Sequence, residues 1–232
     1  MNYTRTPRPR LVAWGAIVLS ALLGVALATV PAAGALGTTP HAHPEAAAVS
    51  TPRVARSDFQ DQMRKLWEDH ITWTRLSIVT FADESPGLGA TADRLLQNQS
   101  DIGDAIAPFY GRAAGDQLTA MLRDHITIAV ELLSAVRAED TEAFDGARTR
   151  WYANGNDIAD FLSAANSRSW PDDLMRADMK QHLDQTLAQV AHELNAECTA
   201  SVADYEVLHT HILMMADRLS DGIIAQFPSR FR

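Results

Sequence analysis

The sequence predicts an all-α protein: a six-helix bundle built from three antiparallel helical hairpins, preceded by an N-terminal signal or anchor helix. Two observations lead to this fold class. Apolar residues recur at three- and four-residue spacing from about residue 58 to residue 227, as on the buried face of a helix, and no segment alternates as a strand does. A pair of short motifs also occurs twice, at an offset close to the length of one hairpin.

The first 35 residues have the features of an export signal. Three arginines within the first ten residues precede an uncharged apolar run from residue 11 to residue 30, and small residues follow. This 20-residue run is also long enough to span a bilayer. Both cleavage after Ala35 and retention as a membrane anchor are compatible with it. We therefore expect an extracytoplasmic protein, either secreted or anchored to the cytoplasmic membrane by its N-terminal helix.

Residues 36–57 contain several prolines without an apolar period, which is typical of a flexible linker, and residues 58–232 form the helical-bundle domain. The formal net charge is −9, and it becomes −12 without the first 35 residues, which hold three arginines and no acidic residue. This acidity disfavours nucleic-acid partners and leaves the N-terminal helix as the expected membrane contact. Cys198 is the single cysteine, so no intramolecular disulfide can form.

Turn residues mark the ends of the first three helices. The first helix ends before Ser85-Pro86-Gly87, the second before Pro108, and the third before Glu139-Asp140. Each segment carries apolar residues at i, i+3 or i+4. The expected spans are about 58–82, 91–107 and 113–138.

The last three helices have clearer boundary residues. Asp140 is a favourable N-cap for the fourth helix. Ser169-Trp170-Pro171-Asp172 opens the fifth, because Ser caps, Pro is tolerated in the first turn and Asp suits the positive end of the helix dipole. Pro228 follows the sixth. The expected spans are about 141–165, 169–197 and 201–226, and short turns join all six helices into three hairpins.

The repeated motifs fall on the first two hairpins. Asp69-His70-Ile71-Thr72 recurs as Asp124-His125-Ile126-Thr127, and each copy is followed by the pattern R-x3-N-x2-D-I-x-D, beginning at Arg94 and at Arg150. Each of the two hairpins thus carries D-H-I-T on its outgoing helix and R-x3-N-x2-D-I-x-D on its returning helix. We expect a degenerate third copy in the last hairpin, with His182 and Thr186 on the outgoing helix and Asp217 on the return.

The histidine of each copy falls on the apolar stripe of its helix, so an imidazole is expected to point into the core three times. A buried imidazole needs a hydrogen-bond partner or a metal ion. Counting residues from each turn, at a rise of about 1.5 Å per residue, places a carboxylate near each histidine. The expected neighbours are Asp101 or Asp104 for His70, Asn154 and Asp157 for His125, and Asp217 for His182.

Two interpretations of this pattern remain open. In the structural one, the His–Asp and His–Asn contacts fix the register of the helices. In the functional one, the side chains converge and bind a divalent transition metal. His209 joins this set because it lies on the core stripe of the sixth helix, whereas His211 is expected to point elsewhere. The candidate metal ligands are His70, His125, His182, His209, Asp101, Asp157 and Asp217.

Parts of the sequence also fit two more specific kinds of metal site. Methionines accompany the histidines in sequence, and thioether plus imidazole is a copper-type ligand set, although methionine at helical spacing is usually core filler. Glu206-x-x-His209 is the one segment that matches the Glu-x-x-His motif of carboxylate-bridged di-metal bundles. No motif for nucleotide binding or nucleophilic catalysis occurs, and no catalytic residue is assigned.

The expected function is therefore an extracytoplasmic, non-enzymatic binding or interaction module with a His/Asp centre that is a candidate site for a divalent metal. One alternative is an oxidative enzyme that uses two metal ions between its helices. The other is a purely structural envelope protein, in which His–Asp pairs fix the helix register.

Four segments resemble a family of small exported bacterial helical proteins. The resemblance extends over residues 63–228 and implies the same exported helical architecture, without adding an activity. The segments are Leu66-Trp67-x2-His70-x2-Trp73-Thr74-Arg75, Leu95-Leu96-Gln97-Asn98-x2-Asp101-Ile102-Gly103, Trp151-Tyr152-Ala153-Asn154-x2-Asp157-Ile158-Ala159, and Gly222-Ile223-Ile224-x-Gln226-Phe227-Pro228.

Overall fold

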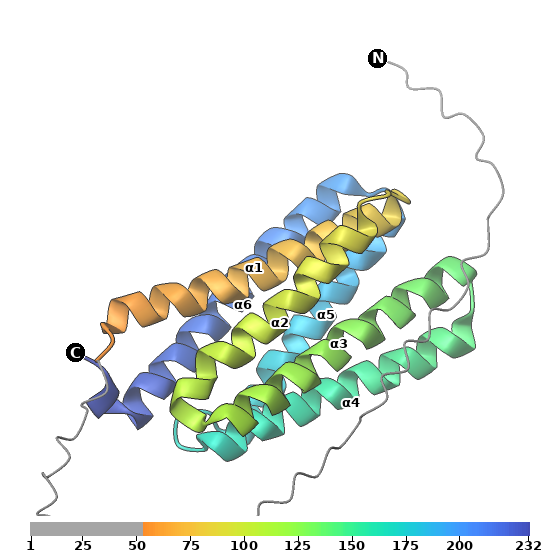
Figure 1. Ribbon diagram of the computed structural model, residues 1–232. Helices are drawn as coiled ribbons and strands as arrows, with labels where there is room; N and C mark the ends of the chain where they lie inside the picture. The colour runs from red at the N-terminus through yellow and green to blue at the C-terminus, as the bar shows by residue number, and fades with distance from the viewer. Residues whose placement is uncertain (1–52) are drawn as a thin grey trace, which may run out of the picture. The chain divides into compact units, whose positions relative to one another are not determined.

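The computed structural model describes residues 53–232, which form six α-helices and one short 3-10 helix (Figure 1). Within this range there is no strand, and one isolated bridge pairs Val54 with Phe231. The all-α prediction is confirmed for these residues. The elements are α1 (Arg56–Ala82), α2 (Leu88–Tyr110), α3 (Arg112–Ala138), α4 (Thr141–Ala165), α5 (Asp172–Leu194), α6 (Cys198–Gln226) and η1 (Pro228–Arg230).

The predicted signal or anchor helix and most of the linker fall in residues 1–52, outside the described residues, so both stay predictions. Among the helices of residues 53–232, none combines the length and the apolar character that crossing a bilayer requires.

The helices pack in chain order and close into a ring. Each helix contacts the next one along the chain, and α6 packs back against α1, which also touches α5 (Figure 1). The two ends of the ring are joined by backbone hydrogen bonds. Val54 N donates to Arg230 O (3.0 Å) and Arg232 N donates to Val54 O (3.1 Å). The odd-numbered helices can therefore turn one face toward a shared centre.

Several helix boundaries differ from the sequence prediction, and two of them contradict the residue that was expected to set the boundary. Pro108 does not stop α2, which continues to Tyr110. A proline in the last turn removes only its own N–H from the helix ladder, and Gly111, with φ of +91°, then redirects the chain. Ser169 does not cap α5, because the N-cap residue is Pro171 and no side chain caps that end.

The predicted cap of α4 is confirmed, since the Asp140 carboxylate accepts a hydrogen bond from Ala143 N (3.0 Å). This bond satisfies one of the free N–H groups in the first turn of the helix. The Asp140 cap fixes the point at which the second hairpin reverses direction.

A close approach of α2 and α3 requires a glycine in the first copy of the repeat. A Cβ atom on Gly103 would lie 2.0 Å from Thr119 Oγ1 and 2.5 Å from Gly115 O. The equivalent position in the second copy is Ala159, which is fully buried. The two hairpins therefore follow one pattern but pack against their neighbours at different distances.

Candidate functional site

Three histidines from three hairpins meet inside the ring. His70 on α1, His125 on α3 and His182 on α5 are 3%, 3% and 4% exposed. The ring centres of His70 and His182 are 5.7 Å apart, and those of His125 and His182 are 6.3 Å apart. The prediction that these imidazoles point into the core is confirmed. We call these three residues the histidine cluster.

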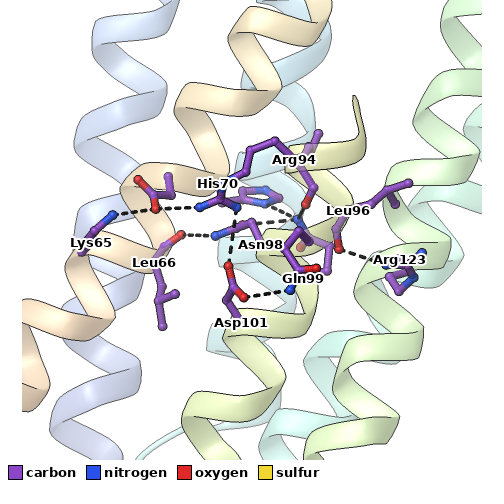
Figure 2. Close-up of polar contacts among 12 residues, drawn as sticks. Lys65, Leu66, His70, Arg94, Leu96, Asn98, Gln99, Asp101 and Arg123 are labelled. Carbon is purple, nitrogen blue, oxygen red and sulfur yellow. Dashed lines mark hydrogen bonds and ion pairs between the residues drawn. The ribbon is translucent and has the colours of Figure 1, made fainter. Parts of the chain in front are cut away.

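The first hairpin holds His70 through an amide and not through a carboxylate (Figure 2). Gln99 Nε2 lies 3.3 Å from His70 Nδ1 and also donates to Leu95 O (2.7 Å). Asn98 Nδ2 donates to Leu66 O (2.9 Å), the carbonyl four residues before His70. The expected pairing of His70 with Asp101 or Asp104 is wrong.

In the second hairpin, one of the two partners that the sequence predicts for His125 is confirmed. His125 Nδ1 lies 2.8 Å from Asn154 Oδ1, and Asn154 Nδ2 donates to Met121 O (3.1 Å), four residues before His125. The imidazole stacks on Trp151 with ring centres 5.0 Å apart, and the Trp151 indole donates to His125 O. The pairing with Asn154 is confirmed, whereas Asp157 is exposed to solvent and does not take part.

The third hairpin repeats this geometry with a different side chain. His211 Nε2 lies 3.0 Å from Asp178 O, and Asp178 stands four residues before His182. The sequence separations of the three equivalent contacts, Leu66–Asn98, Met121–Asn154 and Asp178–His211, are 32, 33 and 33 residues. The third hairpin therefore keeps the carbonyl contact, with His211 in the position of the asparagine. The expected pairing of His182 with Asp217 is wrong, because Asp217 binds Arg64.

The amide contacts select opposite tautomers for the first two histidines. Asn154 uses its amide nitrogen on Met121 O, so its oxygen faces His125 Nδ1, which must carry the proton. Gln99 uses its amide nitrogen toward both Leu95 O and His70, so His70 Nδ1 accepts and its Nε2 carries the proton. His125 is thus left with a free lone pair on Nε2, and His70 with a free N–H.

The cluster is uncharged at neutral pH. Burial lowers the pKa of His70 to about 3, with a further lowering from the nearby His125, and it lowers the pKa of His125 to about 4. Burial also lowers the pKa of His182 well below its usual value, and His70, His125 and His211 add to this shift. Neutral imidazoles are the form that binds metal ions.

Two small cavities touch all three rings. The first, of about 50 Å³, extends between α1, α3 and α5 and is lined by Thr74 and Ser77 besides the cluster. The second, of about 30 Å³, lies on the side of Trp67. Such volumes accommodate water molecules or a single ion with a small ligand, and they are too small for a drug-sized molecule.

Several polar atoms around these cavities have no partner among residues 53–232. These atoms are buried. In native proteins a bound water or ion is a common partner of such an atom. These atoms are His182 Nδ1, Ser77 Oγ and Trp67 Nε1.

The predicted carboxylate ligands lie away from the cluster. Asp217 binds Arg64 of α1 in a two-pronged contact, and this hydrogen-bonded guanidinium lowers the pKa of Asp217. Asp101 faces Arg94 (3.5 Å), as Figure 2 shows, and also accepts from Gln97 (3.0 Å). The cost of desolvating a carboxylate explains why these groups stay near the surface, where arginines can reach them.

His209 also lies outside the cluster. Its Nε2 is 3.2 Å from Glu68 Oε1, and its side chain is 28% exposed. The sequence assignment of α6 was therefore reversed, since His211 is the buried histidine. Within residues 53–232 no three side chains of His, Cys, Asp or Glu stand in the arrangement of a metal site, and Glu206 is exposed, so the di-metal pattern gains no support.

Sequence reasoning missed Gln99, His211 and Asp178. Asp178 is 6% exposed and pairs with Arg218 of α6. A signal for His211 did exist, because the 33-residue separation in the second hairpin, applied to the third, leads to that position. No such signal distinguishes Gln99, which takes its role from the ring orientation of His70.

Comparison of the chain with protein families, curated proteins and solved structures finds no match. The resemblance to exported helical proteins therefore remains a prediction, and a function has to be argued from the histidine cluster itself.

Proposed function

We propose that this chain is an extracytoplasmic, non-enzymatic binding module whose ligand is a transition-metal ion held by the histidine cluster. The observation that carries the proposal is a pair of uncharged imidazoles, His125 with a lone pair on Nε2 and His182 with an unpartnered Nδ1, beside a cavity of about 50 Å³. Imidazole nitrogen is the commonest protein ligand for transition metals.

The ring spacing supports this ligand after a small adjustment. Imidazoles that share one ion place their ring centres about 5.5 Å apart, given metal–nitrogen distances near 2 Å. The ring centres of His125 and His182, which both keep a free nitrogen, are 6.3 Å apart, which exceeds that spacing by less than one ångström. Binding would draw α3 and α5 slightly together, so the metal-bound state is expected to be more compact and more stable.

The contacts of Nδ1 also support the proposal. A metal-bound histidine normally uses its second nitrogen to donate to a carbonyl, a carboxylate or water, which orients the ring. His125 already donates from Nδ1 to Asn154, and this leaves Nε2 for an ion. The orienting side chain sits on a rigid helix, because Asn154 is itself bound to Met121 O.

A purely structural role is the second candidate, and the repeated contact favours it. In every hairpin a side chain of the returning helix donates to the carbonyl four residues before the histidine. This contact fixes the register of two helices without any ligand. The two candidates differ in what happens when both partners of one contact become apolar.

Metal content of the purified protein tests the proposal. We expect close to one ion per chain after mild dialysis, and a higher melting temperature when Zn(II), Co(II) or Cu ions are added to the metal-free protein. His182→Leu should abolish both effects, whereas His209→Ala, which changes a partly exposed histidine outside the cluster, should preserve them. Less than about 0.2 equivalents, with no thermal shift at excess metal, would overturn the proposal.

The double variant His125→Leu/Asn154→Leu separates the two candidates. Replacing both partners of a buried polar contact by apolar groups is often nearly neutral for stability. If metal binding is the function, this variant folds with ordinary stability but binds no ion. If the variant keeps every property of the wild type, the structural role is correct.

A further inference from the structure

We propose that the ion held by the histidine cluster is monovalent copper, Cu(I), with thioether sulfur completing its ligand set. This inference rests on the proposed metal-binding function and narrows it to one kind of ion. Three features carry it: the lack of a carboxylate in the linings of the two cavities within residues 53–232, the methionines of the second cavity, and the number of free imidazole lone pairs.

The first feature is charge. The cavities that touch the cluster are lined by apolar side chains, hydroxyls and neutral imidazoles, with no carboxylate in either lining. The cost of placing an ion in an apolar interior rises with the square of its charge, and no anionic ligand is present to offset it. A divalent ion therefore meets about four times the burial cost of a monovalent one. The site favours a singly charged metal.

The second feature is sulfur. Met63, Met179 and Met215 line the second cavity together with all three histidines, and their exposed fractions are 1%, 6% and 5%. Thioether sulfur is a soft ligand that selects Cu(I) over Zn(II), Mn(II) or Mg(II). These methionines come from α1, α5 and α6, so three helices each contribute one thioether side chain to the lining of this cavity.

The third feature is the tautomer of His70. Because Gln99 donates to His70 Nδ1, the proton of His70 lies on Nε2, and that nitrogen offers no lone pair. His125 keeps a lone pair on Nε2, and His182 has an unpartnered Nδ1. Two imidazoles plus one thioether suit the low coordination numbers of Cu(I), whereas Zn(II) sites are almost always four-coordinate.

Anaerobic titration with Cu(I), in competition with a chromophoric Cu(I) chelator, tests the inference on the full chain. Ag(I) serves as a redox-inert probe of the same charge, and Zn(II) and Co(II) serve as divalent probes. We expect Cu(I) and Ag(I) to bind at one per chain and the divalent ions to bind at least about tenfold more weakly. X-ray absorption at the copper edge should detect sulfur as well as nitrogen ligands.

Two neighbouring methionines of α6 give a matched pair of variants. Met215 lines the cavity, whereas Met214 is 42% exposed on the outside of the bundle. Met215→Leu should weaken Cu(I) binding by about tenfold or more, while Met214→Leu leaves it unchanged. Both changes conserve volume, so both variants should keep the wild-type helix content, measured by circular dichroism.

The possible outcomes separate the inference from the function on which it rests. If no probe ion binds, the proposed metal-binding function fails, and the copper inference fails with it. If Zn(II) or Co(II) binds through the histidine cluster while Cu(I) and Ag(I) do not, the function stands and the inference is overturned. If Cu(I) binds equally well to Met215→Leu and Met214→Leu, the assignment of sulfur ligands is overturned.

Discussion

The first two hairpins share a sequence motif, but they hold their histidines in different ways. In the second hairpin the repeat asparagine, Asn154, binds both the His125 ring and the carbonyl of Met121. In the first hairpin Asn98 keeps the carbonyl contact, and its neighbour Gln99 binds the His70 ring. The two hairpins thus share the hydrogen bond from a side chain of one helix to a carbonyl of the other, whereas the hydrogen bond to the histidine ring differs between them.

The third hairpin extends the comparison. Its returning helix uses His211 for the carbonyl contact, and His182 has an unpartnered Nδ1. Across the three hairpins the helix register is preserved, while Nδ1 of the histidine is an acceptor in the first, a donor in the second and unpartnered in the third. This difference shows that packing constrains the carbonyl contact more tightly than it constrains the chemistry of the cluster.

Acid should produce the largest effect, because it acts on all three histidines together. In the folded state the pKa of His70 is about 3, that of His125 is about 4, and that of His182 is lowered well below its usual value by burial. An unfolded histidine titrates near 6.5, so the unfolded chain binds more protons as pH falls below that value. Stability is full above pH 6.5 and falls as pH decreases. At pH 5 we expect a loss of about 2 kcal/mol from each of His70 and His125, and His182 adds to the loss in the same direction.

Urea unfolding of the metal-free protein at pH 7 and pH 5 measures this loss. His182→Leu should reduce it, since one of three titrating groups is gone. An equal free energy of unfolding at the two pH values would show that the histidines are not buried as a neutral cluster.

The glycine position of the repeat should give the next largest effect. Gly103→Ala places a methyl group against Thr119 and Gly115, where α2 and α3 touch, and we expect a loss of about 3 kcal/mol from this overpacking. The reverse change in the second copy, Ala159→Gly, should cost only about 1 kcal/mol, mainly through backbone entropy. Thermal unfolding of the two variants compares them directly, and equal losses would contradict the difference in packing.

The amide partners should give the smallest effect. Asn154→Ala leaves the Nδ1 proton of His125 without an acceptor, which should lower the free energy of unfolding by about 2 kcal/mol. Gln99→Met should cost less than about 1 kcal/mol, because it also removes the unpartnered Gln99 Oε1 and conserves volume. Nitrogen NMR of the imidazoles checks the cause: the wild type should show the proton on Nδ1 of His125 and on Nε2 of His70.

Much of the fold was predictable because it depends on local pattern. The three- and four-residue spacing of apolar residues, the Asp140 cap and the duplicated motif led to six helices and to three inward-facing histidines. The pairing of His125 with Asn154 also followed from the sequence, since both lie at a known distance from a short turn.

The polar partners could not be predicted with the same reliability. Counting from a turn locates the level of a residue along a helix, but it does not say which way that residue points. Asp101, Asp157 and Asp217 were at suitable heights, yet they face arginines or solvent, because a carboxylate loses more hydration on burial than an amide does. His209 and His211 were exchanged for a related reason, since residues two positions apart lie on nearly opposite sides of a helix.

The sequence by itself therefore determined the helices, their order and the histidines of the core, because helical periodicity and turn chemistry are local properties. Only the tertiary structure decided that Gln99 and His211 make interhelical contacts, and that no carboxylate lines the cavities around the cluster. The physical reason is that rotation of each helix about its axis is set by its neighbours. That rotation selects which polar groups leave water and which remain in it.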